Sequence, residues 1–235
     1  EAAYCETPGR LFDLTLNIAQ LELANKIIET GKPVIIIMLE GRPRVITEIE
    51  PKAKGVLLGF LPGMEGGDAI ADVLFGDVNP SGKLPITYPK TPNGITLYDY
   101  KPIEKFDGND YKPLYPFGFG LSYTSFEYSN LKISSQEITE NDELIVKIDV
   151  KNTGNRAGKE VVQLYLTDKF CSVTRPNKQL KAFEKVMLKP GEVKTVEFKI
   201  NKQQLSFIGQ DNKRIVEPGD FVVTIQNHTA NFELK

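Results

Sequence analysis

The second half of the chain alternates apolar and polar residues with a period of two, and this alternation constrains the fold more than any other feature. Four runs show it, at 143–150, 161–166, 196–200 and 221–225. Such alternation is typical of strands that bury one face. Turn-rich clusters of Gly, Pro and Asn separate the runs. Six or seven short strands in about 110 residues predict a β-sandwich of immunoglobulin-like architecture.

The first half begins with a predicted helix. Asn17 and Gln20 have the spacing of a capping box, in which each side chain bonds the backbone of the other residue. Gly31, followed by Lys32 and Pro33, marks the end of this helix. The apolar residues expected to share one face are Ile18, Leu21, Ala24 and Ile28.

Two short apolar runs and a second helix follow. The continuous apolar run 34–39 predicts a strand covered on both faces, as in parallel sheets, and 55–61 predicts the next strand. Helical spacing over 64–75, ended by Gly76, predicts another helix. Helices and strands in this order, with short connections, indicate an α/β domain.

Residues 77–122 are rich in Pro and Gly, yet carry too many aromatic residues for a disordered spacer. We expect an ordered strap laid over a surface. Its aromatic side chains would either cover a core, the commoner arrangement, or line a sugar site by stacking on sugar rings.

Composition excludes several classes of protein. A net charge of -2 gives no reason to expect nucleic acid or an anionic membrane as a partner. The longest apolar run is far shorter than the roughly 20 residues of a membrane span. One histidine and two cysteines, Cys5 and Cys171, lack the spacing of a metal site, and we expect both thiols to be unpaired. We therefore expect no metal or organic cofactor.

The chain opens without Met, a basic segment or a signal-like apolar stretch. It opens inside a loop, so we expect an artificial or proteolytic start and read the chain as the back part of a longer protein. Compartment is not indicated by the sequence.

Several motifs together resemble glycoside hydrolase family 3, the β-glucosidases and their relatives. The segment that includes N-P-S-G-K-L-P resembles the second domain of that family, and the later motifs resemble its fibronectin type III-like tail. These motifs lie at 41–43, 61–90, 115–126, 174–176, 180–185 and 188–191. The resemblance covers essentially the whole chain.

The resemblance implies a domain order. Residues 1–90 would form the C-terminal part of an αβα sandwich domain, 91–122 the aromatic strap, and 123–235 a fibronectin type III-like β-sandwich. Family members begin with a (β/α)8 barrel that supplies a nucleophilic Asp. Nothing in this sequence resembles that barrel, so we expect the chain to be inactive alone and to need a barrel segment of the same enzyme as its partner.

The resemblance also implies a catalytic residue. The opening residues E-A-A-Y-C-E-T-P-G-R resemble the family loop E-x-x-Y-x-E-T-x-G-D, which places the general acid/base at Glu6. Glu1 is a competing candidate. Arg10 stands where the motif has Asp, and an Arg beside Glu6 would favour its ionised form. Either Arg10 points away from Glu6, or the alignment of the motif is shifted by one turn.

The implied activity is retaining hydrolysis of terminal β-linked glucose, or a related sugar, from an oligosaccharide or β-glucoside. An alternative is a non-catalytic fragment for carbohydrate binding or subunit assembly, and a homo-oligomer stays open. The basic loop with Lys169, Arg175 and Lys178 could reach a neighbouring site, but we expect a solvated run of charge.

Overall fold

The computed structural model describes residues 14–92, 94, 97–101 and 112–235. These residues form two compact units. The N-terminal unit comprises the described parts of 14–78, 84–98 and 112–119, and the C-terminal unit comprises 79–83, 99–101 and 120–235. Each unit has its own hydrophobic core. Mixed α/β structure is followed by an all-β sandwich, so the predicted fold class is confirmed.

The N-terminal unit begins with α1 (Ile18–Glu29), and its predicted capping box is present. The Asn17 side chain accepts a hydrogen bond from the backbone N–H of Ala19 at 2.9 Å, and the Gln20 side chain accepts from the Asn17 N–H at 3.3 Å. The residues of α1 that pack against the core are Leu21, Ala24 and Ile28. Ile18 does not join them, because its side chain at the first turn is 73% exposed.

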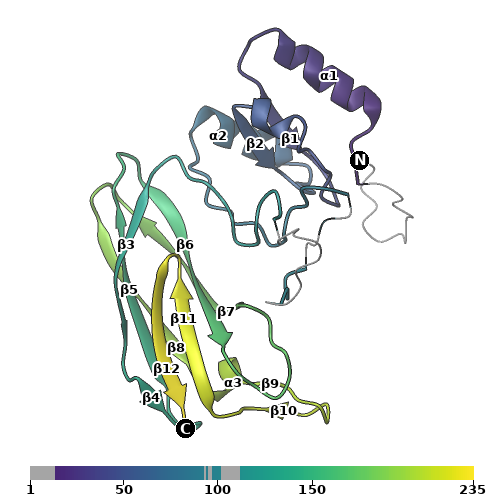
Figure 1. Ribbon diagram of the computed structural model, residues 1–235. Helices are drawn as coiled ribbons and strands as arrows, with labels where there is room; N and C mark the ends of the chain where they lie inside the picture. The colour runs from purple at the N-terminus through teal and green to yellow at the C-terminus, as the bar shows by residue number, and fades with distance from the viewer. Residues whose placement is uncertain (1–13, 93, 95–96, 102–111) are drawn as a thin grey trace. The chain divides into compact units, whose positions relative to one another are not determined.

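A parallel pair of strands, β1 (Ile35–Met38) and β2 (Gly55–Leu58), forms the sheet of this unit (Figure 1). Ile36 and Met38 point into the core. The alternate residues Ile35 and Ile37 are 51% and 39% exposed. The expectation that the run 34–39 is covered on both faces is therefore wrong for the described residues, because the alternate side chains of the run stay largely exposed.

A 3-10 helix, η1 (Glu50–Lys52), precedes β2, and α2 (Gly66–Phe75) follows it. Gly76 ends α2 in the left-handed conformation, with a φ of 87°. Glycine adopts this conformation without the steric penalty that a Cβ atom brings, so the predicted helix end is confirmed.

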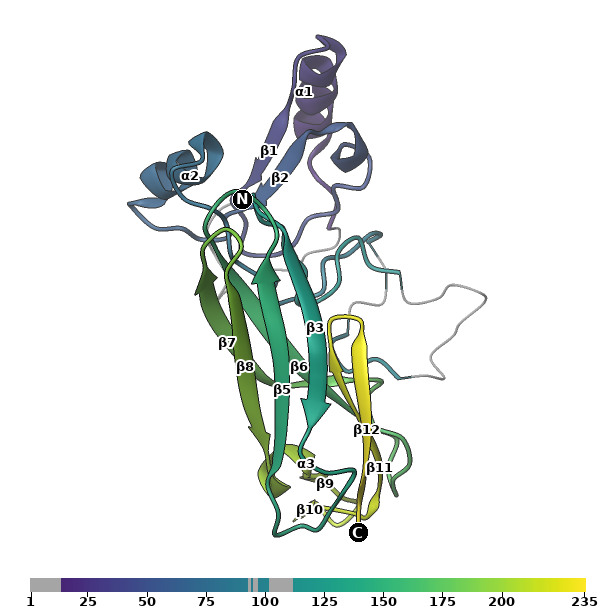
Figure 2. The ribbon, with the colours of Figure 1, turned by 90° about the vertical axis from the view of Figure 1, so that its left-hand side faces the viewer.

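The C-terminal unit is a sandwich of two sheets. A five-stranded sheet has the order β4-β12-β11-β6-β7, and a three-stranded sheet has β5 between β3 and β8, as Figure 2 shows. The strands are β3 (Phe126–Ile133), β4 (Glu137–Ile138), β5 (Leu144–Asn152), β6 (Gly158–Asp168), β7 (Gln179–Leu188), β8 (Val193–Ile200), β11 (Gly219–Ile225) and β12 (His228–Leu234). A short helix α3 (Lys202–Leu205) and the small hairpin β9 (Phe207–Ile208) and β10 (Arg214–Ile215) lie between β8 and β11.

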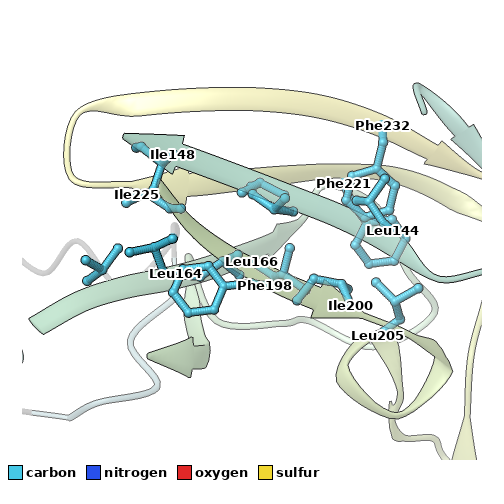
Figure 3. Close-up of a cluster of buried hydrophobic side chains, with 14 of the residues drawn as sticks. Leu144, Ile148, Leu164, Leu166, Phe198, Ile200, Leu205, Phe221, Ile225 and Phe232 are labelled. Carbon is cyan, nitrogen blue, oxygen red and sulfur yellow. The ribbon is translucent and has the colours of Figure 1, made fainter. Parts of the chain in front are cut away.

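The core of this unit lies between the two sheets and includes the alternating apolar residues of the four predicted runs (Figure 3). Apolar residues outside those runs complete it: Ile138, Val186, Leu188, Leu205, Phe232 and Leu234. Leu144 and Ile148 of β5 and Leu164 of β6 are fully buried there. In β5 every second residue is buried and the residues between them are more exposed. The alternating runs therefore bury one face of each sheet, as period-two patterning requires.

Residues 79–83 belong to the C-terminal unit and are fixed to the sandwich by polar contacts. Asn79 donates to the Ala157 carbonyl at 3.1 Å. The Lys83 ammonium lies 3.2 Å from the Glu160 carboxylate, and both side chains are largely buried. Glu160 also accepts a hydrogen bond from the Tyr128 hydroxyl at 2.9 Å.

No helix in the described ranges is long and apolar enough to cross a membrane. Across those same residues, no group of three or more His, Cys, Asp or Glu side chains could hold a metal ion. Cys171 is a free thiol, which donates to the Val173 carbonyl at 2.8 Å. Cys5 lies outside the described residues.

Leu164→Ala tests the sandwich core. Leu164 is fully buried, so the substitution leaves a cavity and should lower the free energy of unfolding by about 2–5 kcal/mol. Leu121→Ala is the matched control, because Leu121 is 75% exposed and its loss should cost less than about 0.5 kcal/mol. Urea denaturation followed by circular dichroism measures both. Equal losses in the two variants would contradict the assignment of the core.

Candidate functional site

The predicted acid/base Glu6 lies outside the described residues, as do Glu1 and Arg10. The structure describes the segment where their loop rejoins the N-terminal unit. The backbone N–H of Val45 donates to the Leu14 carbonyl at 2.8 Å, and Thr15 forms a parallel bridge with Val45. Residues 14 and 15, the first that the structure describes, therefore lie beside the turn that follows β1.

That turn lies at the carboxyl edge of the parallel pair. Just beyond the two strands, the Glu40 N–H donates to the Phe60 carbonyl at 3.1 Å, and the Gly59 N–H donates to the Met38 carbonyl at 2.9 Å. Ligands of α/β domains bind characteristically at the carboxyl ends of parallel strands. This edge, together with the turn from Glu40 to Val45, is the candidate site of the N-terminal unit.

The candidate site contains one buried carboxylate, Glu40, which is 2% exposed. One carboxylate oxygen accepts a hydrogen bond from the Tyr88 hydroxyl at 3.0 Å, and the other accepts from the Arg44 N–H at 3.1 Å. The Tyr88 hydroxyl also lies 2.8 Å from the Arg44 carbonyl, so its single proton is shared between two acceptors. These hydrogen bonds hold the turn after β1 against the segment that contains Tyr88.

Burial of the Tyr88 ring, followed by the adjacent Glu40 charge, raises the pKa of the Tyr88 hydroxyl far above its usual range. Tyr88 therefore stays protonated and acts as a donor. Glu40 is enclosed by its partners and is not accessible to a substrate. Glu40 therefore positions the turn, and it is not a second candidate for the general acid predicted at Glu6.

Two described aromatic residues of 77–122 pack in the core of the N-terminal unit. Tyr88 is fully buried, and Tyr115 lies edge-on to it with ring centroids 6.0 Å apart. The Tyr115 hydroxyl donates to Glu50 at 2.6 Å, and its ring stacks on Phe119 at 5.0 Å. Tyr88 and Tyr115 thus follow the core-covering arrangement, whereas Phe119 and Tyr98 are 37% and 40% exposed.

Sequence reasoning did not single out Glu40 or Tyr88 as residues of a site. A Glu placed between a buried strand and the Gly41–Pro43 break was the available signal, because a charge at that position must find partners. Its partner Tyr88 is 48 positions away along the chain, and no local pattern joins the two.

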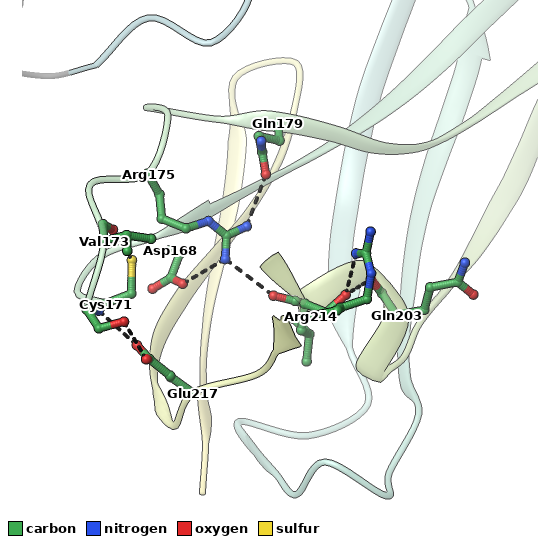
Figure 4. A network of polar contacts seen from close by, with 11 residues as sticks. Asp168, Cys171, Val173, Arg175, Gln179, Gln203, Arg214 and Glu217 are labelled. Atoms are coloured by element: carbon green, nitrogen blue, oxygen red, sulfur yellow. Dashed lines mark hydrogen bonds and ion pairs between the residues drawn. The ribbon is translucent and has the colours of Figure 1, made fainter. Parts of the chain in front are cut away.

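The environment of Arg175 differs from the one predicted from the sequence. The basic loop was predicted to be a solvated run of charge, yet the Arg175 side chain is only 8% exposed and pairs with Asp168 at 3.1 Å (Figure 4). Its guanidinium also lies 4.7 Å from the Phe207 ring centroid. Lys178 covers the Tyr165 ring, whereas Lys169 is exposed. Burial between β6 and β9 gives Arg175 partners that are remote in sequence.

Comparisons with known families match both parts of the chain. Residues 7–123 match the glycosyl hydrolase family 3 C-terminal domain, and residues 160–229 match a fibronectin type III-like domain. A β-xylosidase from Formosa agariphila is 41% identical over 98% of this chain and 33% of its own length. A periplasmic β-glucosidase from Salmonella typhimurium is 42% identical over 91% of this chain and 30% of its own length.

Solved structures give the same result. A β-glucosidase from Erythrobacter marinus has a TM-score of 0.89 and 40% identity, with 95% of this chain and 31% of that chain covered. A Listeria innocua β-glucosidase in complex with glucose has a TM-score of 0.87 and 35% identity, with coverage of 94% and 34%. This chain spans about a third of the length of these relatives.

Alkaline titration tests the buried hydroxyls. The pKa of Tyr88, Tyr115 and Tyr128 is raised mainly by burial and also by a carboxylate partner. Because the folded pKa exceeds the unfolded value of about 10, these neutral hydroxyls stabilise the fold below pH 10, and stability falls as pH rises above it. In an ultraviolet titration we expect these three tyrosines to ionise only together with unfolding.

Tyr88→Phe should remove one late ionisation and lower the free energy of unfolding by about 1–3 kcal/mol, because Glu40 loses a donor while buried. Tyr98→Phe, at a residue 40% exposed, is the control and should have a smaller effect. Ionisation of all nine tyrosines near pH 10 in the folded chain would contradict the burial and pairing of these three hydroxyls.

The family matches, the similarity of sequence and the similarity of structure all agree with the fold described above. The chain belongs to glycoside hydrolase family 3, of which it carries the C-terminal domain followed by a fibronectin type III-like domain.

Proposed function

We propose that this chain is the section of a retaining β-glucosidase-type glycoside hydrolase that supplies the general acid/base, and that Glu6 is this residue. The relatives named above are β-glucosidases and a β-xylosidase, which supports a glycosidase with terminal β-linked glucose or a related sugar as its substrate. The opening loop retains the Glu-Thr pair and the glycine of the family motif.

The structural observation that supports the proposal is the position of Leu14 and Thr15, eight and nine residues after Glu6 in the sequence, at the carboxyl edge of β1 and β2. The bond between Val45 and Leu14 returns the chain to this edge directly after the loop. The buried Glu40 network then fixes the turn that receives it. A carboxyl group on a loop with a fixed end is suited to a site shared by two domains.

The chemistry needs two carboxyl groups about 5–5.5 Å apart. A nucleophilic carboxylate forms the bond to the anomeric carbon while Glu6 donates its proton to the departing oxygen. Glu6 then removes a proton from water, which attacks the glycosyl-enzyme and releases the sugar. The nucleophile would come from a barrel segment of the same enzyme, and this chain alone would be inactive. Arg10 would point away from Glu6, because the acid must begin protonated.

The exposed apolar face of the N-terminal unit supports a larger enzyme. Ile35, Ile37 and Leu39 lie on one face of β1 and are between 39% and 51% exposed. Strands of parallel sheets are normally covered on both faces. Further protein packed on this face, as the αβα architecture implies, would bury these side chains.

Glu6→Ala in an enzyme that contains the barrel segment tests the proposal. Substrates with poor leaving groups need protonation of the departing oxygen, so their kcat/KM should fall by about 10²–10⁴-fold. Activated aryl glycosides should lose far less, and added azide should partly restore the rate, because azide can attack the glycosyl-enzyme without a general base.

Glu1→Ala is the matched control, since Glu1 is the competing carboxylate of the same loop. It should leave the ratio of rates on the two substrates unchanged. Equal loss on both substrates without azide rescue in Glu6→Ala would contradict the assignment. Glycan binding by the chain alone, with no effect of Glu6→Ala on hydrolysis, would favour the alternative of a non-catalytic binding fragment.

A further inference from the structure

The C-terminal unit has an open pocket of about 570 Å³ on the sandwich, outside the candidate site of the N-terminal unit. It is lined by the loop between β6 and β7, by β7 itself and by the hairpin β9–β10. Its charge is strongly asymmetric, with one acidic side chain, Asp99, against four basic ones. The basic side chains are Lys101, Arg175, Lys181 and Arg214.

Arg175 is held rigidly at this pocket, as Figure 4 shows. Its guanidinium donates to Asp168 at 3.1 Å, to the Leu205 carbonyl at 3.3 Å and to Gln179 at 3.0 Å. These bonds occupy three of its five N–H groups. Asp168 neutralises the charge of Arg175. The other basic side chains that line the pocket still outnumber its single acidic side chain, Asp99.

Lys181 lies on β7, half-buried, and its ammonium makes no hydrogen bond with any residue in the described ranges. Burial, followed by the nearby charges of Arg175 and Arg214, lowers the pKa of Lys181. Arg214 donates to the Ser206 hydroxyl at 2.9 Å. Three cations thus converge, and one is partly desolvated without an acceptor.

An anion in this pocket would supply the missing acceptor and relieve the repulsion among the cations. Charge-assisted bonds from Lys and Arg to an oxyanion are among the strongest hydrogen bonds that proteins form. The volume is within the range of small-ligand sites and exceeds what a single small ion requires. Thr174, Gln179 and Ser206 add neutral polar groups to the lining, which suit hydroxyl groups of a ligand.

We propose that this pocket binds an acidic saccharide through its carboxylate or sulfate group, with Lys181 and Arg214 as the anion contacts beside the rigid Arg175. The anionic part of this proposal rests on the pocket alone. The saccharide part rests on the proposed glycosidase function, because such an enzyme meets glycans. The fibronectin type III-like domain would then hold a charged glycan.

Titration of the isotope-labelled 235-residue chain by NMR tests this binding at constant ionic strength. Sodium glucuronate is the probe, and glucose is the neutral control of nearly the same shape. We expect glucuronate to shift the amide signals of β7 and of the hairpin β9–β10, and to bind at least about ten-fold more tightly than glucose. Because no hydrolysis is measured, failure here is distinct from failure of the Glu6 assignment.

Lys181→Gln and Arg214→Gln should each weaken glucuronate binding about ten-fold. Lys185→Gln is the matched control, because Lys185 lies on the same strand, is exposed and does not line the pocket. It should leave the affinity unchanged. Thermal unfolding establishes that the variants fold, and Lys181→Gln should not lower the melting temperature, since it removes a crowded charge.

Four results would overturn the proposal. Equal affinity for glucuronate and glucose, or an equal effect of Lys185→Gln, would exclude a specific anion site. Sulfate ion that binds as tightly as glucuronate would leave a simple oxyanion site and exclude the saccharide. Tighter binding of an acidic peptide than of glucuronate would assign the pocket to a protein partner.

Discussion

The N-terminal unit depends on one buried charge, the carboxylate of Glu40. Glu40 lies just beyond β1, and its backbone N–H donates a hydrogen bond to the carbonyl of Phe60, which follows β2. Its side chain accepts hydrogen bonds from the Tyr88 hydroxyl and the Arg44 N–H. A buried carboxylate is costly unless it is hydrogen-bonded, so strand end, turn and strap are constrained to one arrangement. The Val45 backbone, which bonds Leu14, belongs to this arrangement. A structural residue thereby fixes the turn on which the first described residues of the chain are held.

The C-terminal unit uses the same physical principle for a different purpose. Arg175 is buried and its partners come from β6, β7 and the end of α3, so the guanidinium is rigid before any ligand arrives. Lys181, by contrast, has burial and neighbouring charge but no hydrogen-bond acceptor in the described part of the chain. This difference separates a charge that stabilises the fold from a charge available for binding. It gives the sandwich a proposed role in binding.

The features that could be predicted from the sequence are those that depend on residues close together in the chain. The Asn17 and Gln20 capping box, the helix end at Gly76 and the alternating strands of the sandwich are all present, because each depends on neighbours within a few positions. Contacts between remote residues were missed. The bond of Tyr88 to Glu40 and the burial of Arg175 follow from packing that no periodicity encodes. Glu6 was identified by resemblance alone.

The most direct measurement is a crystal structure of the enzyme that contains both this chain and a barrel segment, with an inhibitor bound at the anomeric position. We predict that the Glu6 carboxyl faces the glycosidic oxygen and lies about 5–5.5 Å from the nucleophilic carboxylate, the separation that retention requires. A different carboxyl group in that position, or a separation of about 6.5 Å or more, would contradict the role proposed for Glu6.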